Sequence, residues 1–358
     1  MNDKSLEVLR QYDIKLNRAA RGRGGMLLDT DKGVRLFLEC MYPNAFYERE
    51  SDITAAIADN GYRLVDTYCR NIDGNLVSVD EDGRRYVLKN WFDGRECSTK
   101  ELADVCDAVR ALGKLHIAME NLPEKLAVAD AVAHTGGVHA VGYQSEEAGI
   151  DGKTSSGQAY GRRSEPLINT YERHMKELKM ATNYLKNKKR RTDFENIAYK
   201  NIGGFHREAV EAVERLNSPS IKAHLQNAYD TGELCHGSFN YHNVLFVGED
   251  AAVTNFDRCR NECRIIDLYQ FMRKILEKYD WDIKLAYRLM DEYNAVRSIS
   301  DSDVELLSAL FAFPEKFWKI INYYFNANKA WIPPKSIEKL NLVVEQNQSR
   351  QRLLETLK

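Results

Sequence analysis

The sequence predicts an α+β protein of two lobes, a small N-terminal lobe built on an antiparallel sheet and a larger, mainly helical C-terminal lobe. At 358 residues the chain is long for a single compact core. Short apolar runs separated by turn residues fill residues 1–92. In residues 93–358, apolar positions recur mostly at steps of three and four. We therefore expect a sheet lobe over 1–92 and a helical lobe over 93–358.

The composition favours a soluble globular protein and excludes several other classes. Hydrophobic residues make up 44% of the chain and charged residues 29%. The formal net charge of -2 gives no general attraction to nucleic acid or to a membrane surface. The chain starts with no basic-then-apolar signal sequence, and no apolar run is long enough to span a bilayer.

Cysteine usage indicates reduced thiols. There are seven cysteines, an odd number scattered through a long chain, which is not the pattern of a disulfide framework. Cys259 and Cys263 have a spacing that metal ligands use, but no second pair with such spacing follows. A zinc site is therefore not expected from the sequence.

The first lobe is predicted to contain two strands, a helix and three strands, in that order. Apolar residues 26–28 and 34–38 flank a polar turn and predict a hairpin. Residues 45–59 predict a helix that ends at Asn60-Gly61. Because Asp-Gly turns separate them, three further segments are predicted as short strands: 62–68, 76–79 and 86–88.

The second lobe begins with a predicted helix over residues 99–119, whose apolar stripe includes His116. We interpret His116 as a buried core histidine. Residues 134–163 are rich in glycine and serine without periodicity, which predicts a flexible insertion. A basic helix over 171–191 follows. It is interpreted either as a solvated face or as a docking site for an acidic partner.

Further helices complete this lobe. They are predicted over 192–215, after Pro219, and from residue 265 to the C-terminus with breaks at Pro314 and Pro333-Pro334.

Residues 234–257 have the outline of a kinase catalytic loop. In such loops an Asp accepts the proton of the substrate hydroxyl, an Asn five residues later binds Mg²⁺, and a second Asp beyond a hairpin binds the metal too. Here Asn243 is in place, whereas Ser238 stands at the base position and Asn255 at the second metal position. The order of strands and helix in the first lobe is also that of a kinase N-lobe. The chain is therefore either a kinase or a kinase-shaped protein that has lost its chemistry.

The substitutions weaken the predicted chemistry at both positions. A serine hydroxyl stays un-ionised and cannot replace a carboxylate as general base at Ser238. Mg²⁺ prefers charged oxygen ligands, so Asn255 lacks a charge that the site needs. Asp257 lies two residues on and faces the same side if the segment is extended. Asn243, Asn255 and Asp257 are therefore predicted as a degenerate Mg²⁺ site, with His242 as an alternative base.

Other residues near this loop have structural interpretations. His236 is predicted to brace the loop through hydrogen bonds to nearby backbone. Asp267, at the start of a predicted helix, is either an N-cap or an anchor for the loop.

The nucleotide side of the predicted site is also incomplete. Gly22 and Gly24 either let the backbone approach a phosphate or belong to a flexible, solvated turn. Trp91 and Phe92 either line a nucleotide cleft or pack the junction between lobes. The second predicted strand, where a kinase carries its phosphate-binding lysine, has no lysine. ATP and Mg²⁺ are the cofactors expected of an active site, and a pseudokinase would need none.

Several strings of this chain together resemble a known family. The strings are 21–24 (RGRG), 86–97 (YVLKNWFDGREC), 236–245 (HGSFNYHNVL), 255–259 (NFDRC), 314–319 (PEKFWK) and 328–333 (NKAWIP). They resemble the CotS-type spore coat proteins of endospore-forming bacteria, a family similar to the aminoglycoside phosphotransferase and choline kinase group. The resemblance covers nearly the whole chain.

The resemblance implies a bilobal, protein-kinase-like fold and a place in the spore coat. It implies other spore coat proteins as partners and a route from the mother-cell cytoplasm to the coat. Members of this family usually carry Asp where Ser238 and Asn255 stand, and a lysine at or near Leu38. The preferred hypothesis is a pseudokinase that acts in coat assembly through protein contacts. The alternative is an active ATP- and Mg²⁺-dependent phosphotransferase for a small hydroxylated molecule.

Overall fold

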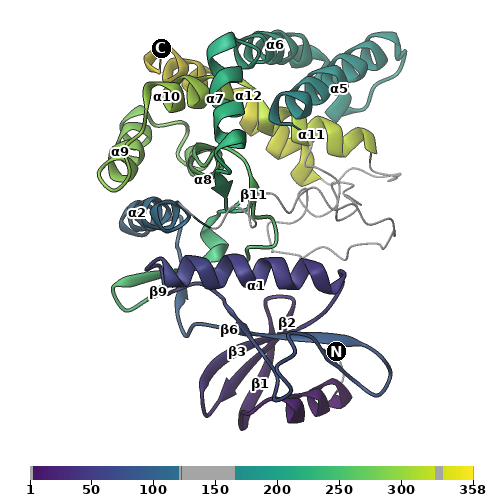
Figure 1. Ribbon diagram of the computed structural model, residues 1–358. Coiled ribbons are helices and arrows are strands. Elements are labelled where there is room, and N and C mark those ends of the chain that lie inside the picture. The colour runs from purple at the N-terminus through teal and green to yellow at the C-terminus, as the bar shows by residue number, and fades with distance from the viewer. Residues whose placement is uncertain (1–2, 121, 123–165, 327–333, 358) are drawn as a thin grey trace.

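The computed structural model describes residues 3–120, 122, 166–326 and 334–357. It contains a sheet lobe and a helical lobe, which lie at the bottom and the top of Figure 1. The predicted α+β organisation in two lobes is therefore confirmed. The insertion predicted at 134–163 lies outside the described residues.

The sheet lobe is a single antiparallel sheet with the strand order β1-β2-β3-β6-β4, and β5 also pairs with β6. The strands are β1 (Leu16–Gly22), β2 (Gly25–Thr30), β3 (Gly33–Glu39), β4 (Tyr68–Cys69), β5 (Ser78–Val79) and β6 (Arg85–Asn90). A short helix η1 (Asp3–Gln11) precedes them. The hairpin predicted from residues 26–38 is β2 and β3.

Strand β1 was not predicted, because most of its residues are exposed and they show no apolar alternation. It turns into β2 through Arg23 and Gly24, whose φ angles of 53° and 73° are left-handed. Gly25 then passes close to β3, where a Cβ atom would lie 2.3 Å from the carbonyl oxygen of Phe37. Only glycine fits at this position without a shift of the backbone.

Helix α1 (Asn44–Asp59) packs with Ile53 and Ile57 fully buried, close to the predicted bounds. The strand predicted over 62–68 is wrong in extent. Most of that segment is irregular, and β4 begins only at Tyr68. Within it, Val65 forms an isolated parallel bridge with Val253 of the helical lobe. This bridge fixes Asp66 near the segment that was predicted as the catalytic loop.

The junction between the lobes is a second, three-stranded sheet in the order β10-β9-β7. It consists of β7 (Arg95–Glu96), β9 (Val244–Val247) and β10 (Asp250–Val253). A small apolar cluster of Leu36, Trp91, Leu245 and Ala252 joins β3 to this hairpin. The chain that leaves the sheet lobe is therefore fastened to the strands that follow the catalytic loop.

The helical lobe packs its helices around one continuous apolar core. Their bounds are α2 (Leu102–Ala118), α5 (Leu167–Asn187), α6 (Asp193–Leu216), α7 (Pro219–Asp230), α8 (Ile265–Leu276), α9 (Ile283–Asn294), α10 (Asp301–Ala312), α11 (Glu315–Asn326) and α12 (Pro334–Thr356). Strands β8 (Leu234–Cys235) and β11 (Arg260–Asn261) pair beneath them. Among the described residues, no helix is both long and apolar enough to cross a membrane.

The basic helix predicted over 171–191 is α5, which begins earlier and ends at Asn187. Its end is set by the start of α6, where Thr192 and Glu195 form a capping box. The Thr192 Oγ1 atom accepts from the Glu195 amide at 3.3 Å, and the Glu195 carboxylate accepts from the Thr192 amide at 2.9 Å. Residues 188–191 therefore form the turn between two helices.

Candidate functional site

The catalytic-loop segment is held by the carboxylate of Asp267. One oxygen accepts the backbone N–H of His236 at 2.6 Å and the other that of Gly237 at 2.9 Å. His116 lies 3.2 Å from the same carboxylate, and its other ring nitrogen bonds to the Tyr293 hydroxyl at 2.7 Å. Burial acts to raise the pKa of Asp267, but the His116 hydrogen bond and these backbone bonds hold it below its ordinary value. Asp267 thus anchors the loop from inside α8.

His236 braces the same loop from within. Its Nε2 lies 3.1 Å from the carbonyl oxygen of Thr254, and its Nδ1 accepts the backbone N–H of Ser238 at 3.2 Å. The ring is fully buried, which lowers its pKa and favours the neutral form that these two bonds require. Gly237 is necessary beside it, because a Cβ there would lie 2.1 Å from the Arg258 carbonyl oxygen.

Ser238 occupies the base position but points its hydroxyl at the backbone. The hydroxyl donates to the carbonyl oxygen of Asn255 at 3.2 Å. The Ser238 carbonyl accepts the side-chain amides of Asn240 at 2.8 Å and Asn243 at 3.0 Å. These contacts connect the loop to the segment after β10. The Ser238 hydroxyl is thus directed at the backbone rather than away from the loop.

The two expected metal positions bind one another. The Asn255 Nδ2 atom donates to Asn243 Oδ1 at 2.7 Å. In an active kinase both side chains at these positions direct oxygens at Mg²⁺. Here an N–H group of one amide points at the oxygen of the other. Asn255 also has a left-handed φ of 68°. The structure therefore brings the predicted pair together, as a neutral amide–amide contact.

Asp257, the third predicted metal residue, is exposed at the edge of this site. Desolvation by the surrounding protein atoms and the charge of Glu50 raise its pKa to about 6, against the opposing charges of Arg258 and Lys89. Asp257 is thus an exposed carboxylate within electrostatic range of both acidic and basic groups, two residues beyond the amide pair.

A buried lysine, which the sequence analysis missed, lies behind the amide pair. Lys89 on β6 donates to Glu50 of α1 at 2.5 Å and to Asp66 at 2.9 Å, with all three side chains almost completely buried. Tyr68 donates to the other Glu50 oxygen at 2.7 Å. A kinase pairs a lysine of its third strand with a glutamate of this helix. In this chain the neighbouring strand supplies the lysine, since Lys89 is paired in register with Leu36 of β3.

Asp66 connects this ion cluster to the amide pair. Its Oδ2 accepts the backbone N–H of Asn255 at 3.2 Å as well as the Lys89 ammonium. Burial raises the pKa of Asp66 to about 6, against the opposing effect of Lys89. Burial acts to lower the pKa of Lys89, but the two carboxylates raise it above the ordinary value. Lys89 is therefore a cation that forms ion pairs with both Glu50 and Asp66.

The expectation that the site lacks a lysine therefore needs correction: β3 has none, and β6 supplies one. A signal was present in the sequence, because Lys89 directly follows the apolar run of residues 86–88 and lies within the same strand, β6. Its two partners are far away along the chain, so no local pattern indicated the contact.

The glycine-containing turn lies against the catalytic loop. Arg23, between Gly22 and Gly24, donates to the carbonyl oxygen of His242 at 2.7 Å and forms an ion pair with Glu96. The His242 Nδ1 atom lies 2.9 Å from the other Glu96 oxygen. We call this group, Arg23, Glu96 and His242, the latch. His242, which the sequence offered as an alternative base, is therefore bonded to the carboxylate of Glu96 at the junction between the lobes.

Trp91 and Phe92 pack the junction between the lobes. Trp91 is 7% exposed and belongs to the apolar cluster with Leu245, and Phe92 packs against the same cluster. The Arg23 guanidinium lies 6.0 Å from the Trp91 ring centroid. Of the two interpretations left open by the sequence, the contacts favour packing.

Comparisons with known proteins agree with this geometry at the level of fold. No protein-family model and no curated protein sequence matches the chain. Among solved structures, it is similar to an aminoglycoside phosphotransferase from Alicyclobacillus acidocaldarius, with a TM-score of 0.80, 17% identity, and coverage of 98% of this chain and 94% of that chain.

Two other solved structures carry a nucleotide in their names. A spectinomycin phosphotransferase in complex with ADP and spectinomycin has a TM-score of 0.59 and 11% identity, and 98% of this chain and 99% of that chain are covered. An amicoumacin kinase in complex with AMP-PNP and Ca²⁺ has a TM-score of 0.53 and 11% identity, with 98% and 94% covered. The chain therefore has the kinase-like fold of aminoglycoside phosphotransferases and related kinases.

Proposed function

We propose that this chain is a pseudokinase that acts through protein contacts, in the spore coat as its family resemblance implies. The observation that carries the proposal is the 2.7 Å hydrogen bond between Asn255 and Asn243. To bind Mg²⁺ together with Asn243, the Asn255 amide must give up this bond, which occupies the Asn243 oxygen. Even then it offers the metal no charge.

Loss of the base adds to loss of the metal ligand. A positioned general base contributes roughly 10²–10⁴-fold to a reaction rate, and the Ser238 hydroxyl is directed at a backbone carbonyl. Lys89 is held by two carboxylates, so its charge is largely compensated before any phosphate arrives. The latch at Arg23 adds a bridge from the glycine-containing turn to the catalytic loop. The missing base and the missing metal charge act against phosphoryl transfer.

A second candidate function is an active small-molecule phosphotransferase that uses ATP and Mg²⁺. The Lys89–Glu50 pair favours it, because active kinases place such a pair beside the nucleotide phosphates. Asp257 would be its charged metal ligand. The similar structures that were solved with ADP or AMP-PNP are consistent with nucleotide binding in this fold.

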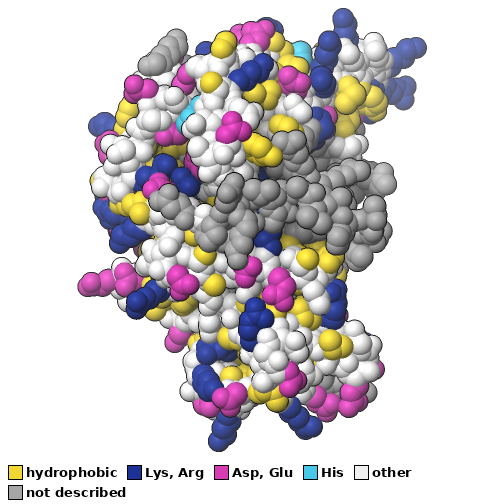
Figure 2. All heavy atoms as spheres, viewed as in Figure 1, with side chains coloured by type: hydrophobic (Ala, Val, Ile, Leu, Met, Phe, Trp, Pro, Cys, Tyr) yellow, Lys and Arg dark blue, Asp and Glu magenta, His cyan; other side chains and the backbone are white. Residues whose placement is uncertain are grey.

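For protein contacts we propose the basic end of α5 and an acidic segment of another coat protein. Lys186, Lys189 and Arg190 are exposed there, and the Tyr184 side chain beside them is 51% exposed. Figure 2 shows Lys and Arg side chains gathered at this end of the helical lobe. Charge reversal at Lys189 and Arg190 should abolish coat localisation of a fluorescent fusion in sporulating cells while thermal stability is unchanged. Normal localisation of that variant contradicts this assignment.

The experiment that tests the pseudokinase is thermal unfolding with ATP, in Mg²⁺ and in EDTA. A ligand at about a hundred times its dissociation constant adds about 2.7 kcal/mol to the free energy of unfolding. For a chain of this length, that raises the midpoint by about 3–4 °C. We expect no Mg²⁺-dependent shift for the natural chain.

A matched variant makes the test informative. The double substitution Ser238→Asp and Asn255→Asp restores both carboxylates, and we expect it to gain a Mg²⁺-dependent shift. A Mg²⁺-dependent shift in the natural chain that Asn243→Ala abolishes would contradict the pseudokinase and support the phosphotransferase. A shift with ATP in EDTA alone would indicate nucleotide binding without transfer.

A further inference from the structure

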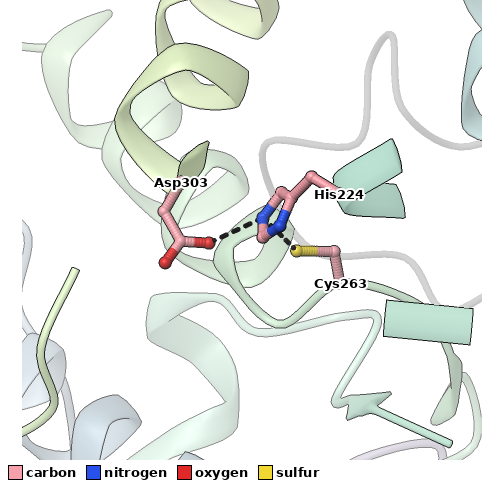
Figure 3. A group of neighbouring side chains, drawn as sticks. All are labelled: His224, Cys263 and Asp303. Atoms are coloured by element: carbon pink, nitrogen blue, oxygen red, sulfur yellow. Dashed lines mark hydrogen bonds and ion pairs between the residues drawn. The ribbon is translucent and has the colours of Figure 1, made fainter. Parts of the chain in front are cut away.

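Three potential metal ligands from distant parts of the chain converge in the helical lobe. His224 comes from α7, Cys263 from the residues between β11 and α8, and Asp303 from the first turn of α10. The His224 Nε2 atom lies 3.0 Å from Asp303 Oδ1 and 3.3 Å from the Cys263 sulfur. All three donor atoms lie within 4.8 Å of one another. Figure 3 shows the three side chains pointing at one another.

The arrangement differs from a catalytic triad. In a triad the nucleophile and the carboxylate contact opposite nitrogens of the imidazole. Here the sulfur and the carboxylate oxygen approach the same nitrogen, Nε2. One N–H hydrogen cannot be aimed well at both atoms. A single cation placed between all three donors satisfies them together.

The surroundings favour a cation at this point. The Cys263 side chain is 1% exposed, and the side chains of His224 and Asp303 are 17% and 10% exposed. The 3.0 Å hydrogen bond between Nε2 and Asp303 Oδ1 needs a proton on Nε2 in the metal-free state, and a metal ion could replace that proton. The carboxylates of Glu233 and Glu305 also lie within electrostatic range of His224.

Asp303 can take part without losing its structural role. Its Oδ2 atom accepts the backbone N–H of Ser300 at 3.0 Å and the Ser300 hydroxyl at 2.8 Å, as part of the capping box of α10. The oxygen that faces His224 is Oδ1. Coordination by Oδ1 thus leaves the helix cap intact.

The donor set and its spacing select a class of metal. One imidazole nitrogen, one thiolate and one carboxylate suit Zn²⁺ and its substitute Co²⁺. With ordinary bond lengths, tetrahedral zinc separates nitrogen from oxygen by about 3.4 Å and nitrogen from sulfur by about 3.6 Å. The two distances from His224 Nε2 are a few tenths of an ångström shorter, and the sulfur and carboxylate oxygen lie within 4.8 Å of each other, so a small adjustment of the side chains admits the ion.

We propose that His224, Cys263 and Asp303 bind one Zn²⁺ ion, with water as the fourth ligand on the exposed side of His224. Binding releases the Nε2 proton of His224 and the thiol proton of Cys263 to solvent, and forms Zn–N, Zn–S and Zn–O bonds. The ion joins α7, α10 and the start of α8. The site stands apart from the amide pair and does not depend on the proposed function.

The test is Co²⁺ titration followed by absorption spectroscopy, with Zn²⁺ content of the purified chain measured in parallel. We expect one Co²⁺ per chain with a thiolate-to-cobalt charge-transfer band, and displacement of the band by Zn²⁺. Cys263→Ser should abolish the band. Cys259→Ser is the matched control, since that thiol is also buried but lies outside the cluster. It should bind Co²⁺ as the natural chain does.

Two further measurements keep the outcome decisive. His224→Gln retains a donor for Asp303 and should weaken Co²⁺ binding at least tenfold, with circular dichroism unchanged. If Cys263→Ser fails to fold, the natural chain and His224→Gln still give the answer. Absence of a thiolate band in the natural chain, or a band that persists in Cys263→Ser, overturns the proposal.

Discussion

Replacing Lys89 by methionine should strongly destabilise the chain, because it leaves two carboxylates buried without their cation. The side chains of Glu50 and Asp66 are 4% and 0% exposed, and each is within 3 Å of the Lys89 ammonium. Methionine fills nearly the same space as lysine, so the change removes the charge and little packing. Breaking a buried ion pair from one side costs about 3–5 kcal/mol. For a chain of this length, the melting midpoint should fall by about 4–7 °C.

The assay is urea and thermal unfolding followed by circular dichroism at pH 8 and pH 5. Because the folded-state pKa of Asp66 is already raised to about 6, acid lets this carboxyl take up a proton and lose its unpaired charge. The deficit of Lys89→Met should therefore be smaller at pH 5 than at pH 8. Adding Glu50→Gln to Lys89→Met should recover part of the stability.

An exposed ion pair supplies the control. Lys32 donates to Asp13 at 2.5 Å, but these side chains are 46% and 88% exposed. Lys32→Met should leave the midpoint unchanged, since exposed pairs contribute little. The reasoning is refuted if Lys89→Met costs no more than Lys32→Met, or if its deficit grows as the pH falls.

Three further predictions concern the loop and its surroundings. Arg23→Ala should open the latch and so speed amide hydrogen exchange in the turn between β1 and β2 roughly tenfold. Arg18→Ala, at an exposed position on β1, should not have this effect. Equal rates in the two variants would argue against the latch. Asp267→Asn should lower the free energy of unfolding in urea by about 1.5–3 kcal/mol, because it weakens an anionic acceptor of two backbone N–H groups; an unchanged urea midpoint would contradict the anchor. Asp257→Asn should stabilise the chain at pH 8, because a carboxyl whose pKa is raised in the folded state destabilises that state when it is charged. The advantage should be lost by pH 4, where the natural carboxyl is protonated. A variant less stable than the natural chain at pH 8 would contradict the raised pKa of Asp257.

Much of the fold was predictable because its signals are local. Helices α1 and α2 repeat apolar residues along one face, and their predicted bounds lie within three residues of the structure. Strand β1 gave no such signal, since its residues Leu16–Gly22 are mostly exposed and it lies at the edge of the sheet, paired with β2. The segment 62–68 gave a false signal, because its apolar residues pack at the junction without forming a strand ladder.

The candidate site also contains residues that the sequence predicted and one that it missed. Asn243 and Asn255 were predicted to lie together because kinase loops fix their spacing, and the structure places them in contact. Lys89 was missed because its partners precede it by 39 and 23 residues, a separation that only the folded sheet and α1 close. Motif spacing reports contacts within one loop and is blind to contacts between elements.

The amide pair has a consequence for how this fold responds to its surroundings. In a phosphotransferase the same two positions are joined by an ion that enters and leaves, so the contact between loop and hairpin follows the supply of magnesium and nucleotide. In this chain the hydrogen bond between Asn255 and Asn243 connects the two positions. Under the proposed function, the contact between loop and hairpin would therefore not depend on magnesium or nucleotide, as suits a structural component.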